Sequence, residues 1–281
     1  MRVIEQVSDL RALVKSWKQA GLTVGFVPTM GNLHAGHLSL VEIAQQKCDR
    51  VIASIFVNPM QFGPDEDFDR YPRTFKEDSE KLAGLVVDAI FVPTVKEMYP
   101  NGVEQALVTV PDSITGLLEG ASRPGHFDGV STVVTKLFNM VQPDVAVFGQ
   151  KDFQQLLVIH RMVEDLAMPI EVVVAPIARD LDGLALSSRN QYLTAEQRLI
   201  APKFNTILLD ISTALQSGNR QFDQLCQTAI QQLLDTGFDA VDYIQICQPA
   251  SLAPSQAENN TFVILAVARL GKTRLLDNIL L

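Results

Sequence analysis

One stretch of the chain decides the fold: Thr23-Val24-Gly25-Phe26-Val27-Pro28-Thr29-Met30-Gly31-Asn32-Leu33-His34-Ala35-Gly36-His37. Its apolar start, residues 23–27, predicts a buried strand, residues 28–32 predict a loop, and residues 35–48 predict a helix. A buried strand that leads through a short loop into a helix is typical of an α/β domain. We therefore expect a ligand site at this junction, because open parallel sheets bind ligands where their strands end.

The same alternation continues on both sides of this stretch. Ser8 can cap a helix that Gly21 ends, and Thr74 with Glu77 resembles a capping box at the start of another. Further helices are predicted at 130–141 and 152–166, and further strands at 51–57, 87–92, 145–148 and 170–174. Strands that alternate with helices in this way predict a parallel sheet covered by helices.

Beyond Pro176 the pattern changes. A loop is predicted at 179–193, followed by a long helical stretch that a Thr194/Gln197 capping box opens and Pro202 interrupts. Two strands are predicted near 241–247 and 262–268. We therefore expect two domains, residues 1–176 and a smaller α+β domain at residues 177–281.

Composition excludes several classes of protein. The 281 residues are 47% apolar and 20% charged, as in ordinary globular proteins, and their net charge of −9 argues against a sequence-independent nucleic-acid binder. No apolar run approaches the roughly 20 residues of a membrane span, and the start of the chain lacks a signal-peptide pattern. We expect a cytoplasmic protein with no membrane partner. The three cysteines have no metal-site spacing and are expected to be buried, reduced thiols.

Two histidines, His34 and His37, flank Gly36 at the first strand–helix junction. The free N–H groups of a helix N-terminus favour phosphate, and Gly36 lets a nucleotide lie close to the backbone. Imidazoles can donate hydrogen bonds to phosphoryl oxygens while charge builds in an in-line displacement. HxGH at this position resembles the signature of the nucleotidylyltransferase superfamily, which predicts adenylyl or cytidylyl transfer without naming the acceptor.

Two further segments have residues suited to phosphate. In Gly149-Gln150-Lys151-Asp152, Lys151 can supply positive charge, Gly149 can admit a ribose, and Asp152 can accept ribose hydroxyls or help to hold Mg²⁺. In Leu186-Ser187-Ser188-Arg189, the hydroxyls can donate to phosphate and the guanidinium can bind it bidentately. A solvated helix start and a polar surface loop are the alternatives for these segments.

Neutral polar side chains predict where an organic acid binds. Gln61, in the segment Asn58–Gly63, and Gln155 offer uncharged donors and acceptors suited to a hydroxylated acid, although a plain turn at 58–63 is the alternative. The glycine-rich loop Arg123–Gly129 can meet a carboxylate, and its role is left open. Gly271-Lys272-Thr273 is not a Walker A loop, because Ala266 stands at the place of the first glycine.

Taken together, these segments resemble the pantothenate synthetase family over roughly residues 24–193. The resemblance rests on Pro28–Gly31 before HxGH, Phe56–Phe62, Gly125–Val130, Gly149–Leu156 and Ser187–Asn190, in this order. It implies a Rossmann-like N-terminal domain with helices on both faces of the sheet, a smaller C-terminal lid, a homodimer, and ATP as cosubstrate with Mg²⁺. Leu186 departs from the family, in which methionine is common at this place.

The resemblance also implies a role for each matching residue. Gln61 and Gln155 would bind (R)-pantoate, Gln61 would lie near β-alanine as well, and His37 would be the proton donor. The catalytic set would be His34, His37, Lys151, Ser187, Ser188 and Arg189. The ATP site would consist of Met30, Gly31, Asn32, Leu33, His34, Ala35, Gly36, His37, Gly149, Gln150, Lys151, Asp152, Ala178, Leu186, Ser187, Ser188 and Arg189.

The implied reaction has two steps. The carboxylate of (R)-pantoate attacks the α-phosphorus of ATP and pyrophosphate leaves; the amine of β-alanine then attacks the mixed anhydride, giving (R)-pantothenate and AMP. Two alternatives remain: a nucleotidylyltransferase with another acceptor, and a catalytically silent sensor of nucleotide or pantoate. Binding alone would not require all of His34, His37, Lys151 and Arg189, which argues against the sensor.

Overall fold

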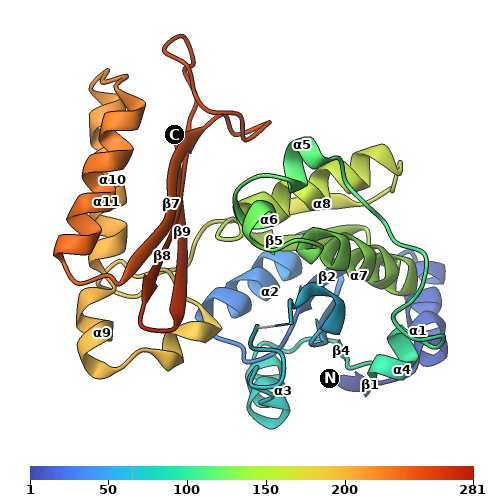
Figure 1. Ribbon diagram of the computed structural model, residues 1–281. Helices are drawn as coiled ribbons and strands as arrows, with labels where there is room; N and C mark the ends of the chain where they lie inside the picture. Colours follow the sequence, from blue (N-terminus) through green and yellow to red (C-terminus); the bar gives the residue numbers. More distant parts are fainter. Residues whose placement is uncertain (65) are drawn as a thin grey trace. The chain divides into compact units, whose positions relative to one another are not determined.

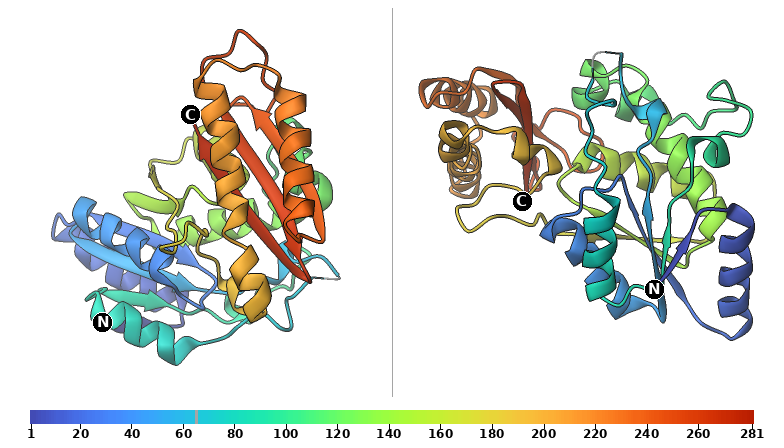
Figure 2. Two further views of the ribbon diagram at one scale, coloured as in Figure 1. Left: turned by 90° about the vertical axis from the view of Figure 1, so that its left-hand side faces the viewer. Right: turned by 90° about the horizontal axis from the view of Figure 1, so that it is seen from below.

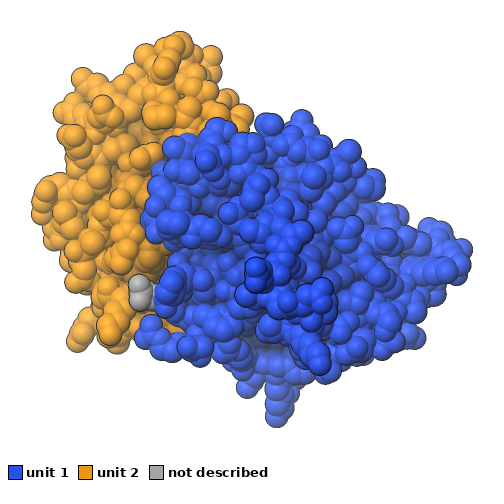
Figure 3. Space-filling model, turned by 45° about the vertical axis from the view of Figure 1, so that its right-hand side comes forward, with its two compact units in different colours: residues 1–149, 154–175 blue, residues 150–153, 176–281 orange. Residues whose placement is uncertain are grey.

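The computed structural model describes residues 1–64 and 66–281. The chain separates into two compact units (Figure 3). Unit 1 consists of Met1–Gly149 and Gln154–Ala175, and unit 2 of Gln150–Phe153 and Pro176–Leu281. The short segment Gln150–Phe153 therefore packs with the C-terminal part of the chain, although it directly follows a strand of unit 1.

Unit 1 is built on one sheet of six parallel strands, as the alternating pattern predicts. The strand order is β1-β4-β3-β2-β5-β6. The bounds are β1 Arg2–Ile4, β2 Val24–Thr29, β3 Arg50–Ile55, β4 Ala89–Phe91, β5 Val145–Gly149 and β6 Glu171–Ala175. The first strand has only three residues, too few for a recognisable pattern, and was not predicted.

Helices cover both faces of this sheet (Figures 1 and 2). Phe26 and Val27 are adjacent in β2 and therefore point to opposite faces. Phe26 meets Phe138 of α7 edge to face, with ring centroids 6.4 Å apart. Val27 belongs to the core cluster that contains Leu40 of α2 and Leu82 of α3. The central strand is buried on both faces, which is why it lacks the alternation of a half-exposed strand.

Of the eight helices described in unit 1, five were predicted with somewhat different ends, and three short ones were not predicted. Their bounds are α1 Val7–Gln19, α2 Ala35–Lys47, α3 Phe75–Gly84, α4 Val95–Met98, α5 Asp112–Thr115, α6 Leu118–Ser122, α7 His126–Val141 and α8 Phe153–Asp165, with a 3₁₀ turn η1 at Pro59–Gln61. The predicted Ser8 cap is wrong, because Gln6 is the N-cap residue of α1. The predicted Thr74 capping box is also wrong: the Thr74 hydroxyl donates to Asp78 Oδ2 at 3.1 Å instead.

Two predicted loops are shorter than expected. Strand β2 continues through Pro28 to Thr29, so the loop begins at Met30. Helix α7 begins at His126, four residues before the predicted start, so half of the predicted glycine-rich loop is helical. Its N-cap residue, Gly125, has a φ of +78°, which favours glycine, and glycine is a poor helix former. The two glycines at 125 and 129 therefore concealed the helix start.

In unit 2, helices pack against one face of an antiparallel sheet. The bounds are α9 Ala195–Ile200, α10 Lys203–Gln216, α11 Phe222–Asp235, β7 Ala240–Cys247, β8 Val263–Leu270 and β9 Thr273–Leu280, with a 3₁₀ turn η2 at Ser188–Tyr192. The predicted break at Pro202 and the Thr194/Gln197 capping box are both present. Strand β9 was not predicted. The Gly271-Lys272 turn joins it to β8, since Leu270 pairs with Thr273, so this segment is a hairpin and not a phosphate loop.

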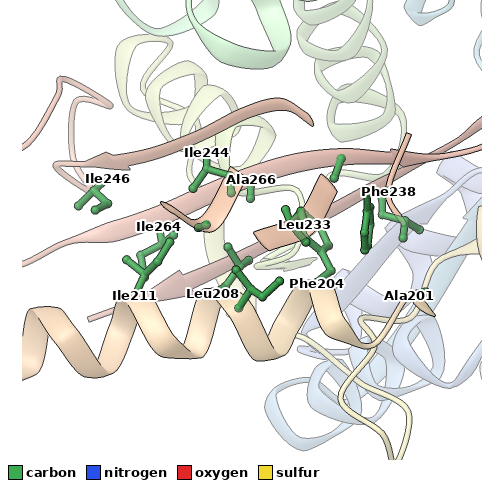
Figure 4. Packing of buried hydrophobic residues seen from close by; sticks show 14 of the residues in the cluster. Ala201, Phe204, Leu208, Ile211, Leu233, Phe238, Ile244, Ile246, Ile264 and Ala266 are labelled. Carbon is green, nitrogen blue, oxygen red and sulfur yellow. The ribbon is translucent and has the colours of Figure 1, made fainter. Parts of the chain in front are cut away.

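The core of unit 2 lies between its two long helices and its sheet. Figure 4 shows its packing between α10 and the strands. Phe204, Leu208 and Ile211 come from α10, and Ile264 and Ala266 from the facing strand β8. These side chains are at most 3% exposed. Unit 2 therefore has an apolar core of its own.

The cysteine prediction is only partly right. All three thiols are free, but only Cys247 is buried, while Cys48 and Cys226 are half-buried. Across the described chain, no helix is both long and apolar enough to cross a membrane.

Candidate active site

The strand order predicts a ligand site next to β2. The chain leaves β2 for β3 on one side and later enters β5 on the other side. In open α/β sheets, ligands bind outside the carboxyl ends of the strands where the order reverses in this way. Strand β2 ends at Thr29 and strand β5 at Gly149, so the predicted residues Met30–His37 and Gly149 follow directly from this edge.

Side chains of α3 hold the backbone of the Met30–His34 loop in place. Gly31 and Asn32 have φ values of +84° and +50°, and a Cβ on Gly31 would lie 3.2 Å from Asp78 Oδ2. The buried Asp78 accepts the N–H groups of Asn32 at 2.8 Å and of Leu33 at 2.7 Å. The ammonium of Lys81 donates to the Leu33 carbonyl at 2.6 Å. The loop backbone is therefore held in place by residues 45 or more positions along the chain.

The two histidines of the HxGH motif form the cap of α2. His34 is the N-cap residue, and its Nδ1 accepts the N–H of Gly36 at 3.2 Å. His37 Nδ1 accepts the N–H of His34 at 3.3 Å, and the ring centroids are 4.1 Å apart. Because each Nδ1 is an acceptor, each neutral ring carries its proton on Nε2. Both rings are thus in the tautomer that can donate from Nε2 to a phosphoryl oxygen.

Gln61 lies next to the Met30–His34 loop. Its Nε2 donates to Met30 Sδ at 3.2 Å, and its Oε1 accepts from Asn58 Nδ2 at 3.1 Å. The buried Asn58 is itself held by the Tyr99 hydroxyl, which donates to Asn58 Oδ1 at 2.6 Å. Burial raises the pKa of Tyr99 above its usual value, so this hydroxyl stays protonated. The structure therefore brings together a predicted pantoate residue and a predicted ATP residue.

The role of the Arg123–Gly129 segment is left open by the sequence. In the structure its side chains contact the backbone of Gln61. Arg123 donates from Nε and from its second terminal nitrogen to Glu66 Oε1 and Oε2, both at 2.6 Å. His126 Nδ1 lies 2.7 Å from the Gln61 carbonyl, and its Nε2 lies 3.0 Å from Arg123. Burial, together with the charge of Arg123, lowers the pKa of His126 to about 4. Neutral His126 therefore donates from Nδ1 to Gln61 and accepts from Arg123 at Nε2.

Helix α7 approaches the same turn closely. A Cβ on Gly129 would lie 2.3 Å from the Met60 carbonyl oxygen and 2.8 Å from the Gln61 nitrogen. The Gly129 carbonyl accepts from Asn58 Nδ2 at 3.1 Å. Gly129 is thus required for the packing of α7 against η1, which explains a glycine in a helix.

Gln155 and its neighbour have different surroundings. Gln155 is half-buried on the first turn of α8, and in the part of the chain that the structure describes no hydrogen bond joins it to Gln61. Gln154 is buried; its Nε2 donates to the carbonyls of Ile114 and Leu117, and its Oε1 accepts the N–H of Glu119. Gln154 therefore holds the α5–α6 segment in place.

In unit 2 the predicted residues Ala178 and Leu186 are neighbours, because residues 178–186 form a small hairpin. The N–H of Leu186 donates to the Ala178 carbonyl at 2.9 Å, and Arg179 forms a bridge with Ala185. Ser187 Oγ, at the start of η2, accepts the N–H of Arg189 at 3.3 Å. The Ala178 and Leu186–Arg189 predictions thus describe one local structure.

The Gln150–Asp152 loop belongs to unit 2 as well. Asn278 of β9 donates from Nδ2 to the carbonyls of Gln150 and Lys151. Lys151 Nζ lies 3.8 Å from Asp152 Oδ1, and the Asp152 side chain is 51% exposed. Its carboxylate is therefore accessible to a ligand.

Comparison with known proteins shows the family to which the chain belongs. The family model described as pantoate-beta-alanine ligase matches residues 2–280. This chain belongs to the pantoate-beta-alanine ligase family. The family resemblance, the α/β fold and the enzyme class predicted from the sequence are confirmed.

Individual relatives in this ligase family match over their full length. A pantothenate synthetase from Hydrogenovibrio crunogenus is 61% identical over 280 residues, covering 100% of this chain and 99% of that protein. The crystal structure of pantothenate synthetase from Thermus thermophilus matches with a TM-score of 0.92 and 45% identity, covering 99% of each chain. The pantoate-beta-alanine ligase from Francisella tularensis, complexed with beta-gamma ATP and beta-alanine, matches with a TM-score of 0.84 and 36% identity, covering 100% of this chain and 97% of that one.

The sequence did not reveal the residues that support the site loops through hydrogen bonds. They are Asp78, Tyr99, Asp277 and Asn278. A buried carboxylate or amide near no motif gives no local signal, because its partners come from distant parts of the chain. For Asp277 and Asn278, the only indication available from the sequence was a possible third strand after the Gly271-Lys272 turn.

Proposed function

We propose that this chain catalyses the ATP-dependent condensation of (R)-pantoate with β-alanine, through a pantoyl-adenylate, to (R)-pantothenate, AMP and pyrophosphate. The product, vitamin B5, then serves coenzyme A biosynthesis. Family membership over residues 2–280 supports the overall reaction. The observation that supports this site is the hydrogen bond from Gln61 to Met30, which joins the predicted acid-binding and nucleotide-binding residues.

In the first step, a pantoate carboxylate oxygen attacks the α-phosphorus, and the bond to the bridging oxygen of pyrophosphate breaks. The Nε2–H groups of His34 and His37 donate to the phosphoryl oxygens as negative charge builds. Lys151, Ser187, Ser188 and Arg189 neutralise and bind the phosphates. Gln61 and Gln155 orient pantoate. Holding pantoate and ATP in the reactive geometry supplies much of the rate acceleration.

In the second step, the β-alanine amine attacks the acyl carbon of the mixed anhydride, the acyl–oxygen bond breaks, and AMP leaves. The proton lost by the attacking amine passes to the phosphate of the leaving AMP or to water, and we assign to Gln61 the role of orienting the amine. No side-chain nucleophile is required, because the acyl group is already activated by the phosphate. Exclusion of water protects this intermediate, and we assign that role to unit 2 as a lid.

Mg²⁺ is proposed to enter with ATP. Bound to the phosphates, it would neutralise part of their charge. Among the described residues no group of three or more His, Cys, Asp or Glu side chains could hold a metal ion. The exposed Asp152 carboxylate is the candidate protein ligand. A homodimer, which rests on the family resemblance, and a cytoplasmic location, which is expected from the sequence pattern, complete the proposal.

The deciding experiment is adenylate formation without the amine. Purified protein is incubated with Mg²⁺-ATP and (R)-pantoate, and pyrophosphate release and pantoyl-adenylate are measured by exchange and by mass spectrometry. We expect both, and rapid pantothenate formation once β-alanine is added. Absence of pyrophosphate release at saturating pantoate would favour a transferase with another acceptor, and nucleotide binding without turnover would favour a sensor.

A further inference from the structure

Two consecutive residues of β9 contact the two segments of unit 2 that carry predicted phosphate-binding residues: Asp277 bonds to Arg179 in the hairpin that leads to Arg189, and Asn278 bonds to Gln150 and Lys151. Both are buried, at 3% and 1% exposed. Neighbouring residues in a strand point to opposite faces, so this pair reaches to both sides of the sheet. The two loops are therefore attached to points only about 3.8 Å apart along the backbone.

Asn278 holds the loop that carries Lys151. Its Nδ2 donates to the carbonyl of Gln150 at 3.0 Å and to that of Lys151 at 2.9 Å, and its Oδ1 accepts from Gln150 Nε2 at 3.0 Å. The three residues between β5 and α8 belong to neither a strand nor a helix. Two bonds from one buried amide thus hold the backbone from which the Lys151 side chain extends, and a third bond holds the Gln150 side chain.

Asp277 holds the hairpin that carries Ala178 and leads to Arg189. Its carboxylate accepts two hydrogen bonds from Arg179, at 2.6 and 2.7 Å, and one from the Asn278 N–H at 2.8 Å. Arg179 also donates to the Gly183 carbonyl at 3.1 Å and so closes the hairpin. Asn205 of α10 approaches the same carboxylate at 3.4 Å.

Stability alone does not explain this arrangement. A buried ion pair seldom stabilises a fold more than apolar residues of the same volume, although it fixes one geometry sharply. A strand that already packs an apolar core has no need of an adjacent buried acid and amide. The chemistry of phosphoryl transfer does need fixed cations, because a displacement of about 1 Å can cost about 100-fold in rate.

We propose that Asp277 and Asn278 are positioning residues for the nucleotide: Asn278 sets the Lys151 backbone and Asp277 sets the Ala178–Arg189 loop, so that one strand fixes the spacing of two phosphate-binding segments. This inference rests on the proposed function, since it assumes that Lys151 and Arg189 bind ATP. It predicts an effect on ATP use and little effect on pantoate binding.

The test is a double-mutant cycle in the full chain, read as kcat/KM for ATP in adenylate formation. We expect Asn278→Leu to lower kcat/KM for ATP by about 10- to 100-fold and to leave the KM for pantoate within about twofold. Combined with Lys151→Ala, it should lower the rate no further than Lys151→Ala does alone, to within about threefold. Asp277→Asn should behave in the same way towards Arg189→Ala.

Ile264→Val in the unit 2 core is the matched control, because it weakens the apolar packing of the same sheet and removes no hydrogen bond to either loop. Its effect and that of Lys151→Ala should multiply. If the losses from Asn278→Leu and Lys151→Ala also multiply, or if Asn278→Leu changes the KM values for ATP and pantoate equally, the residue is structural and the inference is wrong. Should Asn278→Leu fail to fold, Asn278→Ser enters the same cycle.

The failure of the inference and that of the proposed function are distinguishable. If the unaltered protein makes no pantoyl-adenylate, or if Lys151→Ala retains full activity, the proposed function or its nucleotide site fails, and the inference fails with it. If Lys151→Ala is impaired but Asn278→Leu is fully active, only the inference fails.

Discussion

At the scale of single residues, the tautomers of His34 and His37 have a consequence for catalysis. Both rings use Nδ1 to accept backbone N–H groups, so Nε2–H is the group that each can offer to the phosphate. Such a donor acts most strongly when charge builds in the transition state and less strongly on bound ATP.

We therefore expect His37→Ala to lower the rate of adenylate formation by about 100- to 1,000-fold while the Kd for ATP changes only a few-fold. Single-turnover kinetics and ATP titration separate these two effects. His160→Ala, at an exposed histidine of α8, is the control and should be fully active. An unchanged kcat with a raised KM would reduce His37 to a binding residue.

His126 gives a pH-dependent stability at the same scale. Its folded pKa is lowered to about 4 by burial and by the charge of Arg123, whereas an unfolded histidine has a pKa of about 6.5. Between these values the unfolded chain binds a proton that the folded chain does not bind. The free energy of unfolding therefore falls as the pH falls from about 6.5 to about 4.

His126→Asn removes this titration and keeps an amide donor near the Gln61 carbonyl. Urea unfolding at pH 7 and pH 4.5 should show that the unaltered protein loses on the order of 2 kcal/mol more than the variant over this interval. Parallel pH profiles for the two proteins would mean that His126 does not carry the effect. Enzyme activity at pH 7, where both proteins are folded, shows whether the substitution also disturbs the geometry of the site.

At the scale of elements, the contact of α7 with η1 decides where Gln61 lies. Gly129 leaves no room for a Cβ, since the Met60 carbonyl oxygen would be 2.3 Å away. A methyl group there must push the helix and the turn apart, and it must strain the Asn58 bond to the Gly129 carbonyl.

Gly129→Ala should therefore destabilise the protein by about 1–3 kcal/mol, although alanine is the better helix former. It should also raise the KM for pantoate more than that for ATP. Gly84→Ala, at the end of α3 with nothing within 4 Å of the added Cβ, is the matched control and should be neutral or slightly stabilising. Equal stability of the two variants, measured by urea unfolding, would contradict the close approach.

At the scale of the whole molecule, two units with separate apolar cores should lose stability separately. Leu208 belongs to the core of unit 2 and Leu82 to the core of unit 1, and both are at most 1% exposed. Each Leu→Ala change should cost about 2–5 kcal/mol in its own unit.

Hydrogen exchange read by mass spectrometry tests this expectation. Leu208→Ala should increase exchange in β7–β9 and leave β2, β3 and β5 protected, and Leu82→Ala should do the reverse. Increased exchange throughout the chain in both variants would show that the two units unfold as one.

The sequence by itself determined the parallel α/β sheet and the position of HxGH at its first strand–helix junction. These features depend on local apolar patterns and on the chain order of strands and helices. The break at Pro202 and the Thr194 cap were predictable for the same reason, because proline and capping residues act on their own neighbours.

Only the tertiary structure decided which residues hold the site. Asp78 lies 45 residues from Leu33, and Asn278 lies 128 residues from Gln150. The residue at which α7 starts and the need for glycine at position 129 likewise depend on the packing of α7 against η1. A local pattern can indicate that a segment binds phosphate, but the position of that segment is fixed by buried hydrogen bonds whose partners become neighbours only when the chain folds.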